Sequence, residues 1–380
     1  MDPNIVATQA FLSKATAPED VFGEIPAGAL HNRVREVVLR YRKIIQVMHP
    51  DKFQAKVDIE GAQAAFVQLT HWRELAEKKL IAGTYGDKAV PPPAPPADVP
   101  RATAPQVVKT AKRSYIVKDR ITQGDIADLY ACSFTEGTSD REALFKVAQA
   151  ADDNDLLENE AKRLKVLYPA DQADEKFYRY LPKLLDTFML KGTASTRRVN
   201  VLTLAEGYRS LAEVRKVYPK GLDFRDVVWM FKRSLAAIGF VHKKGLVHGA
   251  VIPSHILVHP VGHGAKLVDW CYAVAPGEKV RALVSAYKPF YAPEILAKQP
   301  VSPQTDIYML CKCAVALLGG NVETNQMPAA VPRPIQAFLQ SGLIKAPARR
   351  ANDAWDLHKE FDELLLRLVG KPTYRELVMP

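Results

Sequence analysis

Apolar residues recur in steps of three and four through two stretches of the first ninety residues. In the first stretch they stand at Val34, Val38, Tyr41, Ile45 and Met48. This spacing puts them on one stripe of a helix, which is expected to end at His49 because the residue before a proline resists helical geometry. The second stretch repeats the pattern at Ala62, Phe66, Leu69, Ala76 and Leu80. Together the two patterns predict an all-α module, an antiparallel helical hairpin, within residues 1–88.

The pattern breaks after this module. Residues 89–105 read AVPPPAPPADVPRATAP and contain almost no large apolar side chain. A Pro- and Ala-rich segment favours an extended spacer and cannot bury a core. Residues 89–113 are therefore predicted to be a linker.

Short β-type runs separated by turns begin after the linker. They occupy 114–134 and 141–149, and they are followed by a charged amphipathic helix at 153–167. Further strands are expected at 198–207, 255–260 and 264–270, with a long helix at 224–245 and mostly helices thereafter. Strands with one helix first and helices afterwards predict a two-lobed α+β arrangement.

Composition narrows the functional classes. The formal charge is +10, but Asp and Glu stand between most of the basic residues, so a nucleic-acid partner is not expected. No apolar run reaches the length of a membrane span, and the first residues lack the pattern of a signal peptide. The four cysteines, Cys132, Cys271, Cys311 and Cys313, lie in apolar segments. A protein of the reducing cytoplasm, without a membrane partner, is expected.

The N-terminal pattern resembles the J-domain of DnaJ-type co-chaperones. A basic amphipathic helix, the tetrapeptide His49-Pro50-Asp51-Lys52 and a second helix follow one another as in that family. The resemblance implies that His49, Pro50 and Asp51 stimulate ATP hydrolysis by a DnaK-class chaperone. It also implies docking on that chaperone by basic residues, namely Arg35, Arg40, Arg42, Lys43 and Lys52. The zinc-binding cysteines and Gly- and Phe-rich runs of full co-chaperones are absent from the sequence. The alternative interpretation is a plain helical hairpin in which the tetrapeptide is only a turn.

The order of motifs in residues 114–370 resembles the protein kinase fold, with a small lobe at 114–206 and a large lobe at 207–370. The matching positions are Lys146, Glu160, Glu206, His248, Asp269, Glu294, Asp306 and Arg350. The resemblance implies that Lys146 and Glu160 pair beside the nucleotide phosphates, and that Glu206 lies in a hinge stretch, 202–207. It implies that Asp269 binds Mg²⁺. It also implies structural roles for Glu294, Asp306 and Arg350.

Several catalytic positions depart from the kinase pattern. Only Gly124 remains of the Gly-rich loop, and the loop around His248 carries Ala250 in place of the catalytic Asp. His255 replaces the metal-binding Asn, and Trp270-Cys271 replaces Phe-Gly. Alanine has no acceptor that could orient a substrate hydroxyl, so phosphoryl transfer is expected to be impaired. The catalytic site is therefore expected to be degenerate. The domain is expected to be a pseudokinase rather than an enzyme.

Two interpretations of the retained residues stay open. Lys146, Glu160, Gly124, Glu206 and Asp269 allow binding of ATP with one Mg²⁺. Alternatively, Lys146 and Glu160 are a structural ion pair and Asp269 only shapes a strand end.

The favoured function is a J-domain adaptor that recruits a DnaK-class chaperone and uses its pseudokinase domain to bind a client protein or a nucleotide. Two alternatives are an active, divergent Ser/Thr kinase or nucleotidyl transferase, and a protein-binding scaffold without a chaperone partner.

Overall fold

The computed structural model describes residues 2–27, 106–168, 175–191, 195–371 and 373–379, together with scattered positions between 33 and 86. The chain divides into two compact units, Met1–Pro100 and Arg101–Pro380. None of the described helices is both long and apolar enough to cross a membrane.

The first unit begins with helices α1 (Pro3–Lys14) and α2 (Pro18–Phe22). The sequence patterns did not predict α1. Described residues between 33 and 45 and between 61 and 80 are helical. Their buried apolar side chains include Val37, Tyr41, Leu69, Ala76 and Leu80.

The predicted hairpin can be compared with the structure only in part. Tyr41, Leu69, Ala76 and Leu80 are predicted stripe positions and are buried, and Ile45 is half-buried. Val34, Val38, Met48, Ala62 and Phe66 lie outside the described residues, as do His49, Pro50, Asp51, Arg35, Arg42 and Lys52. The J-domain hairpin therefore stays a prediction.

Two of the predicted docking residues are described. The Arg40 guanidinium pairs with Glu36 at 2.9 Å and donates to the carbonyl oxygens of Phe22 and Glu24 at 2.6 and 2.8 Å. Lys43 is exposed. Arg40 thus ties its helix to the end of α2, a contact within the unit.

A six-stranded antiparallel sheet opens the second unit, with the strand order β1-β2-β3-β4-β6-β5. Its strands are β1 (Gln106–Lys109), β2 (Ser114–Gln123), β3 (Ala127–Glu136), β4 (Ser139–Ala148), β5 (Leu184–Lys191) and β6 (Thr196–Thr203). The sequence places residues 106–109 in the linker and does not predict β5. The structure pairs β1 with β2, so the sheet starts before residue 114.

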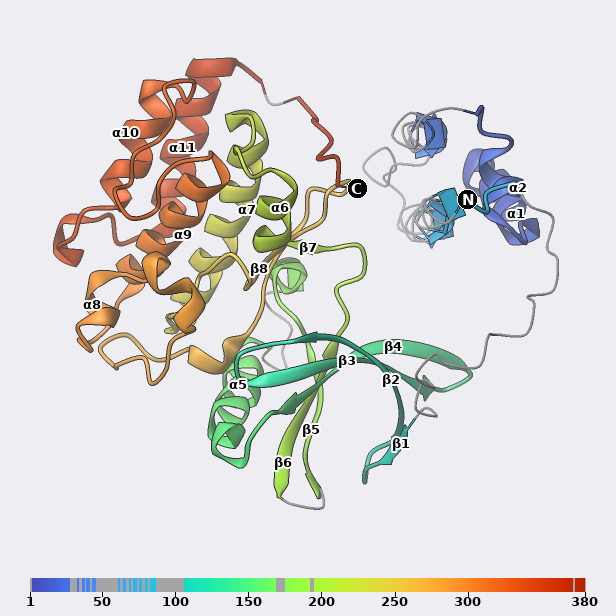
Figure 1. The fold of residues 1–380 in the computed structure, drawn as a ribbon, viewed down its shortest axis with the longest axis horizontal. Coiled ribbons are helices and arrows are strands. Elements are labelled where there is room, and N and C mark those ends of the chain that lie inside the picture. The colour runs from blue at the N-terminus through green and yellow to red at the C-terminus, as the bar shows by residue number, and fades with distance from the viewer. Residues whose placement is uncertain are drawn as a thin grey trace. The chain divides into compact units, whose positions relative to one another are not determined.

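Alternation along β4 gives the sheet its two faces. Ala143, Phe145 and Val147 pack into an aromatic cluster with Tyr115 and Phe134. Leu144 and Lys146 point to the opposite face. That face is covered by α5 (Asn154–Leu167) and the helical region, as Figure 1 shows. Lys146 is thereby directed toward the junction between sheet and helices.

The remainder of the second unit is mainly helical. Its helices are α6 (Leu211–Val217), α7 (Phe224–Lys243), α8 (Pro293–Leu296), α9 (Pro303–Leu317), α10 (Arg333–Gly342) and α11 (Ala354–Val369). A second sheet joins β7 (Arg209–Ser210), β8 (Ile256–Val258) and β9 (Ala265–Leu267). Short 3₁₀ turns include η3 (Glu175–Tyr180), η4 (Trp270–Tyr272), η5 (Ser285–Phe290) and η6 (Pro347–Arg349).

Helix α9 is the centre of this region. Its residues from Thr305 to Leu317 are buried, as expected for a helix that neighbours surround on all sides. Asp223 caps α7 and Asp353 caps α11 through side chains that accept backbone N–H groups. The predicted α+β character of the second unit is confirmed.

Candidate active site

Three predicted residues meet where the sheet joins the helical region. Lys146 comes from β4, Glu160 from the buried face of α5, and Asp269 from the turn after β9. The Lys146 Nζ atom lies 3.0 Å from Glu160 Oε1 and 3.0 Å from Asp269 Oδ1. All three side chains are buried or nearly so.

The charges of this cluster stabilise one another. Burial alone would lower the pKa of Lys146, but Asp269, Cys271 and Glu160 raise it well above its ordinary value. Burial would likewise raise the pKa of Asp269, but Lys146 and His255 hold it below its usual range. Lys146 and Asp269 are therefore an ionised pair.

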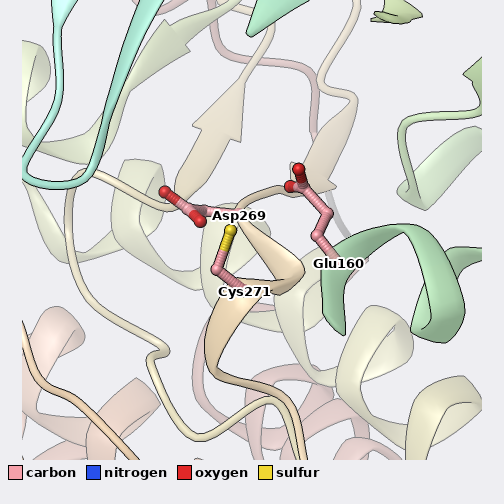
Figure 2. Close-up of side chains that lie close together, drawn as sticks. All are labelled: Glu160, Asp269 and Cys271. Carbon is pink, nitrogen blue, oxygen red and sulfur yellow. The ribbon is translucent and has the colours of Figure 1, made fainter. Parts of the chain in front are cut away.

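A fourth member of the cluster is Cys271, which the sequence did not place there. Figure 2 shows its thiol beside the carboxylates of Glu160 and Asp269. The potential ligand atoms of these three residues lie within 4.8 Å of one another, close enough to hold a metal ion. However, Lys146 Nζ lies 3.3 Å from Cys271 Sγ and 3.0 Å from each carboxylate. The ammonium group already stands where a cation would bind.

The same residues do not fit Mg²⁺. This ion demands octahedral coordination by oxygen atoms, and kinases hold it with an Asp and an Asn. Here Oδ1 of Asp269 faces Lys146, and Oδ2 faces His255 Nε2 at 3.4 Å. Both oxygens of the predicted magnesium ligand are thus turned toward cationic or donor groups.

His255 lies between Asp269 and the backbone of Ala250. Its Nδ1 lies 3.0 Å from the carbonyl oxygen of Ala250, while Nε2 faces the Asp269 carboxylate. Both neighbours are acceptors, and each faces one of the two ring nitrogens. His255 thus lies against the predicted magnesium ligand, at the position where the resemblance to kinases implies a metal-binding Asn.

A further link between the sheet and the helical region is formed by Tyr272 and Asp125. The Tyr272 hydroxyl, which is buried, donates to the carboxylate of Asp125 in the turn between β2 and β3. Burial raises the pKa of Tyr272, so this hydroxyl keeps its proton. The Tyr272 ring stacks on His255 with centroids 5.8 Å apart. The segment after Asp269 is thereby fastened to the turn between β2 and β3.

The loop around His248 is held by hydrogen bonds to α9. Asp306 of α9 accepts the backbone N–H groups of His248 and Gly249 at 2.8 and 2.9 Å. In the kinase motif His-Arg-Asp an arginine follows the histidine. Here the position holds Gly249, whose φ is +72°, and a Cβ there would lie 2.8 Å from Val280 Cγ2. An arginine therefore does not fit without rearrangement. Ala250 is fully buried.

His248 is held in its neutral form. Its Nδ1 accepts the N–H of Ala250 at 3.3 Å, and its Nε2 donates to the carbonyl of Val268 at 3.1 Å. Burial lowers the pKa of His248 to about 4, against the opposing effect of Asp306. The ring packs edge-on against Trp270 with centroids 4.6 Å apart.

This histidine predicts acid lability. Between pH 6.5 and about 4 the unfolded chain takes up a proton at His248 while the folded chain does not. Stability is therefore expected to fall across this range as pH falls, by about 3 kcal/mol in total. Urea unfolding at several pH values, followed by tryptophan fluorescence, measures the slope. His248→Asn removes the titration and should flatten it; equal slopes in both proteins would contradict the prediction.

The predicted structural residues also come together. Arg350 donates two hydrogen bonds to the buried Glu294 carboxylate, at 2.7 and 3.1 Å, and its guanidinium lies over the Tyr308 ring at 4.5 Å. Of the remaining predicted nucleotide residues, Gly124 and Glu206 are exposed. Gly124 donates its N–H to Ala127 O at 2.8 Å in a tight turn.

Comparison with known proteins relates this chain to kinases at low identity. Sperm motility kinase 3A of Mus musculus is 27% identical over 181 residues, which are 47% of this chain and 33% of that protein. Sperm motility kinase 2B of the same species is 29% identical over 131 residues, 34% of this chain and 26% of that protein. The serine/threonine-protein kinase PAK mbt of Drosophila melanogaster is 25% identical over 175 residues, 40% of this chain and 26% of that protein.

The chain spans a third or less of the length of these relatives. No family model matches it. The similarity to kinases and the curled antiparallel sheet nevertheless support a kinase-like domain in the second unit. The resemblance to J-domains gains no support from these relatives.

Proposed function

We propose that the second unit is a pseudokinase that acts by binding protein rather than by transferring phosphate. This proposal rests on Ala250, a buried residue at the position where a kinase has its catalytic Asp. A methyl group cannot accept a hydrogen bond from a substrate hydroxyl. Losing that interaction costs about two to four powers of ten in rate.

The contacts around Ala250 support the same proposal. Lys146 and Tyr272 join the sheet to the helical region through an ion pair with Asp269 and a hydrogen bond to Asp125, and His255 faces Asp269 from within the helical region. Leu144 stands two residues before Lys146, where the kinase motif Val-Ala-Ile-Lys has alanine, and it is partly buried against the helical core. Lys146 and His255 are paired with groups of the same chain at the positions where the resemblance to kinases places the nucleotide and its metal ion.

A phosphate-transfer assay tests this function. The full chain, incubated with γ-labelled ATP, Mg²⁺ or Mn²⁺ and general protein substrates, is expected to give no incorporation above that of its Asp269→Asn variant. Ala250→Asp is expected to leave the result unchanged, because His255 and Trp270-Cys271 also depart from the kinase pattern. Metal-dependent labelling by the wild type that is lost in Asp269→Asn would show an active, divergent kinase instead.

We further propose that the first unit is a J-domain that brings a DnaK-class chaperone to whatever the pseudokinase binds. The support is the sequence His49-Pro50-Asp51 after a basic amphipathic helix. Clustered positive charge would steer the encounter with an acidic chaperone surface. The full chain should raise the ATPase rate of such a chaperone, and His49→Gln should abolish the increase. Equal rates with both proteins would leave a scaffold without a chaperone partner.

A further inference from the structure

Residues 373–379 lie on the surface of the helical region as an extended segment, here called the strap. It forms neither helix nor strand. Figure 1 shows the chain leaving the end of α11 and running back toward the loop between β8 and β9. The sequence pattern ends the domain at residue 370 and does not predict these contacts.

The strap is anchored by charge at Arg375. Its guanidinium donates to both carboxylate oxygens of Asp226, at 2.9 and 3.2 Å, in the first turn of α7. Asp223, the N-cap of the same helix, lies 3.9 Å away. Two hydrogen bonds from one side chain to one carboxylate require the planar guanidinium group, so this site selects arginine over lysine.

Tyr374, the residue before Arg375, is held in an aromatic stack. The His263 ring lies between the rings of Trp229 and Tyr374, with centroids at 4.1 and 4.6 Å. His263 has φ of +49°, a strained value for a residue other than glycine. Its Nε2 donates to the carbonyl of Arg375 at 2.6 Å, and the Tyr374 hydroxyl donates to Val261 O at 2.9 Å.

A third anchor is apolar. Leu377 is 3% exposed and belongs to the core of the helical region. The Tyr218 hydroxyl donates to the carbonyl of Val378 at 2.5 Å, beyond the buried leucine. The strap is therefore held as a bound peptide is held, by a stacked ring, a forked ion pair and a buried aliphatic side chain rather than by a strand ladder.

We infer that Tyr218, Asp226, Trp229 and His263 form a docking groove for an extended peptide with the pattern Tyr-Arg-x-Leu. The strap fills this groove within its own chain, and a partner protein carrying the same pattern competes with it. Being tethered, the strap acts at an effective concentration of about millimolar. A partner therefore binds well only when the strap is displaced or disabled. This inference does not depend on whether the kinase-like cleft binds nucleotide.

Binding of a labelled peptide with the sequence of residues 371–380 tests the groove. The full chain carrying Arg375→Glu and Leu377→Asp is expected to bind this peptide at least tenfold more tightly than the wild type does. Adding Asp226→Arg to that protein should abolish the binding, whereas Asp362→Arg, at an acidic position on α11, should not. No gain over the wild type, in a variant with an unchanged near-ultraviolet circular dichroism spectrum, would overturn the inference.

A second measurement needs no substitution. Hydrogen exchange of the wild-type chain, read by mass spectrometry, is recorded with and without a large excess of the same unlabelled peptide. Deuterium uptake by residues 373–379 of the chain is expected to rise as the peptide displaces the strap. A matched peptide with glutamate in place of its arginine should leave uptake unchanged. Equal uptake with all peptides would show that the strap is a permanent part of the fold.

Discussion

Replacing Lys146 by methionine is expected to destabilise the kinase-like domain by about 3–5 kcal/mol, because it leaves buried carboxylates without their cation. Lys146 lies 3.0 Å from both Glu160 and Asp269 and is itself buried. In a kinase that relies on nucleotide, this lysine serves mainly the phosphates. Here it holds the sheet, α5 and the turn after β9 together.

Urea unfolding followed by tryptophan fluorescence measures the loss, since three of the four tryptophans, Trp229, Trp270 and Trp355, lie in this domain. Lys118→Met is the matched control. Lys118 pairs with Glu142 at 2.7 Å on the exposed surface, where such a pair contributes less than about 1 kcal/mol. Adding Glu160→Gln to Lys146→Met should recover part of the loss. A loss no larger than that of the control would contradict the structural role of Lys146.

Arg350→Met is expected to cost a similar amount, about 3–5 kcal/mol, for the same reason. Its side chain is fully buried and pairs with Glu294 through two hydrogen bonds. The guanidinium also donates to the carbonyl oxygens of Ile344 and Lys345, at 2.6 and 2.8 Å. The substitution leaves the carboxylate without its cation, with only the Thr305 hydroxyl still donating to it at 2.9 Å, and removes a donor from each of these carbonyls.

The neighbouring residue offers a matched control for this prediction. Arg349 is exposed, so Arg349→Met should change the free energy of unfolding by no more than about 0.5 kcal/mol. Adding Glu294→Gln to Arg350→Met removes the stranded charge and should restore part of the stability. Equal effects of the two arginine substitutions would show that the Glu294–Arg350 pair does not anchor the helical region.

The order of elements could be predicted from periodicity where one face of an element is buried. The alternation of Ala143, Phe145 and Val147 marks β4, and the amphipathic run around Glu160 marks α5. Strand β5 has no such alternation, because most of its side chains are only partly buried. Strand β1 is only four residues long and follows a Pro-rich segment, so the sequence pattern places its residues in the linker.

The site could be predicted only where a family pattern fixes the positions. Lys146, Glu160 and Asp269 are far apart in sequence, and the resemblance to kinases was the sole reason to group them. Tyr272 and Asp125 follow no such pattern. Their contact depends on how the sheet sits on the helical region, which periodicity does not encode. The contacts of the strap could not be predicted from the sequence either, because the spacing of Arg375 and Leu377 is typical of neither a helix nor a strand.

Thermal unfolding of the full chain with and without millimolar Mg²⁺-ATP tests whether contacts within the chain, from Lys146 to Glu160 and Asp269, take the place of nucleotide binding. A ligand that binds only the folded state at 100 times its Kd adds about 2.7 kcal/mol to its stability and must raise the melting temperature. The same midpoint is expected with ATP, with Mg²⁺-ATP and without either. A rise with Mg²⁺-ATP that disappears in Asp269→Asn would contradict it and make the domain a nucleotide-binding one.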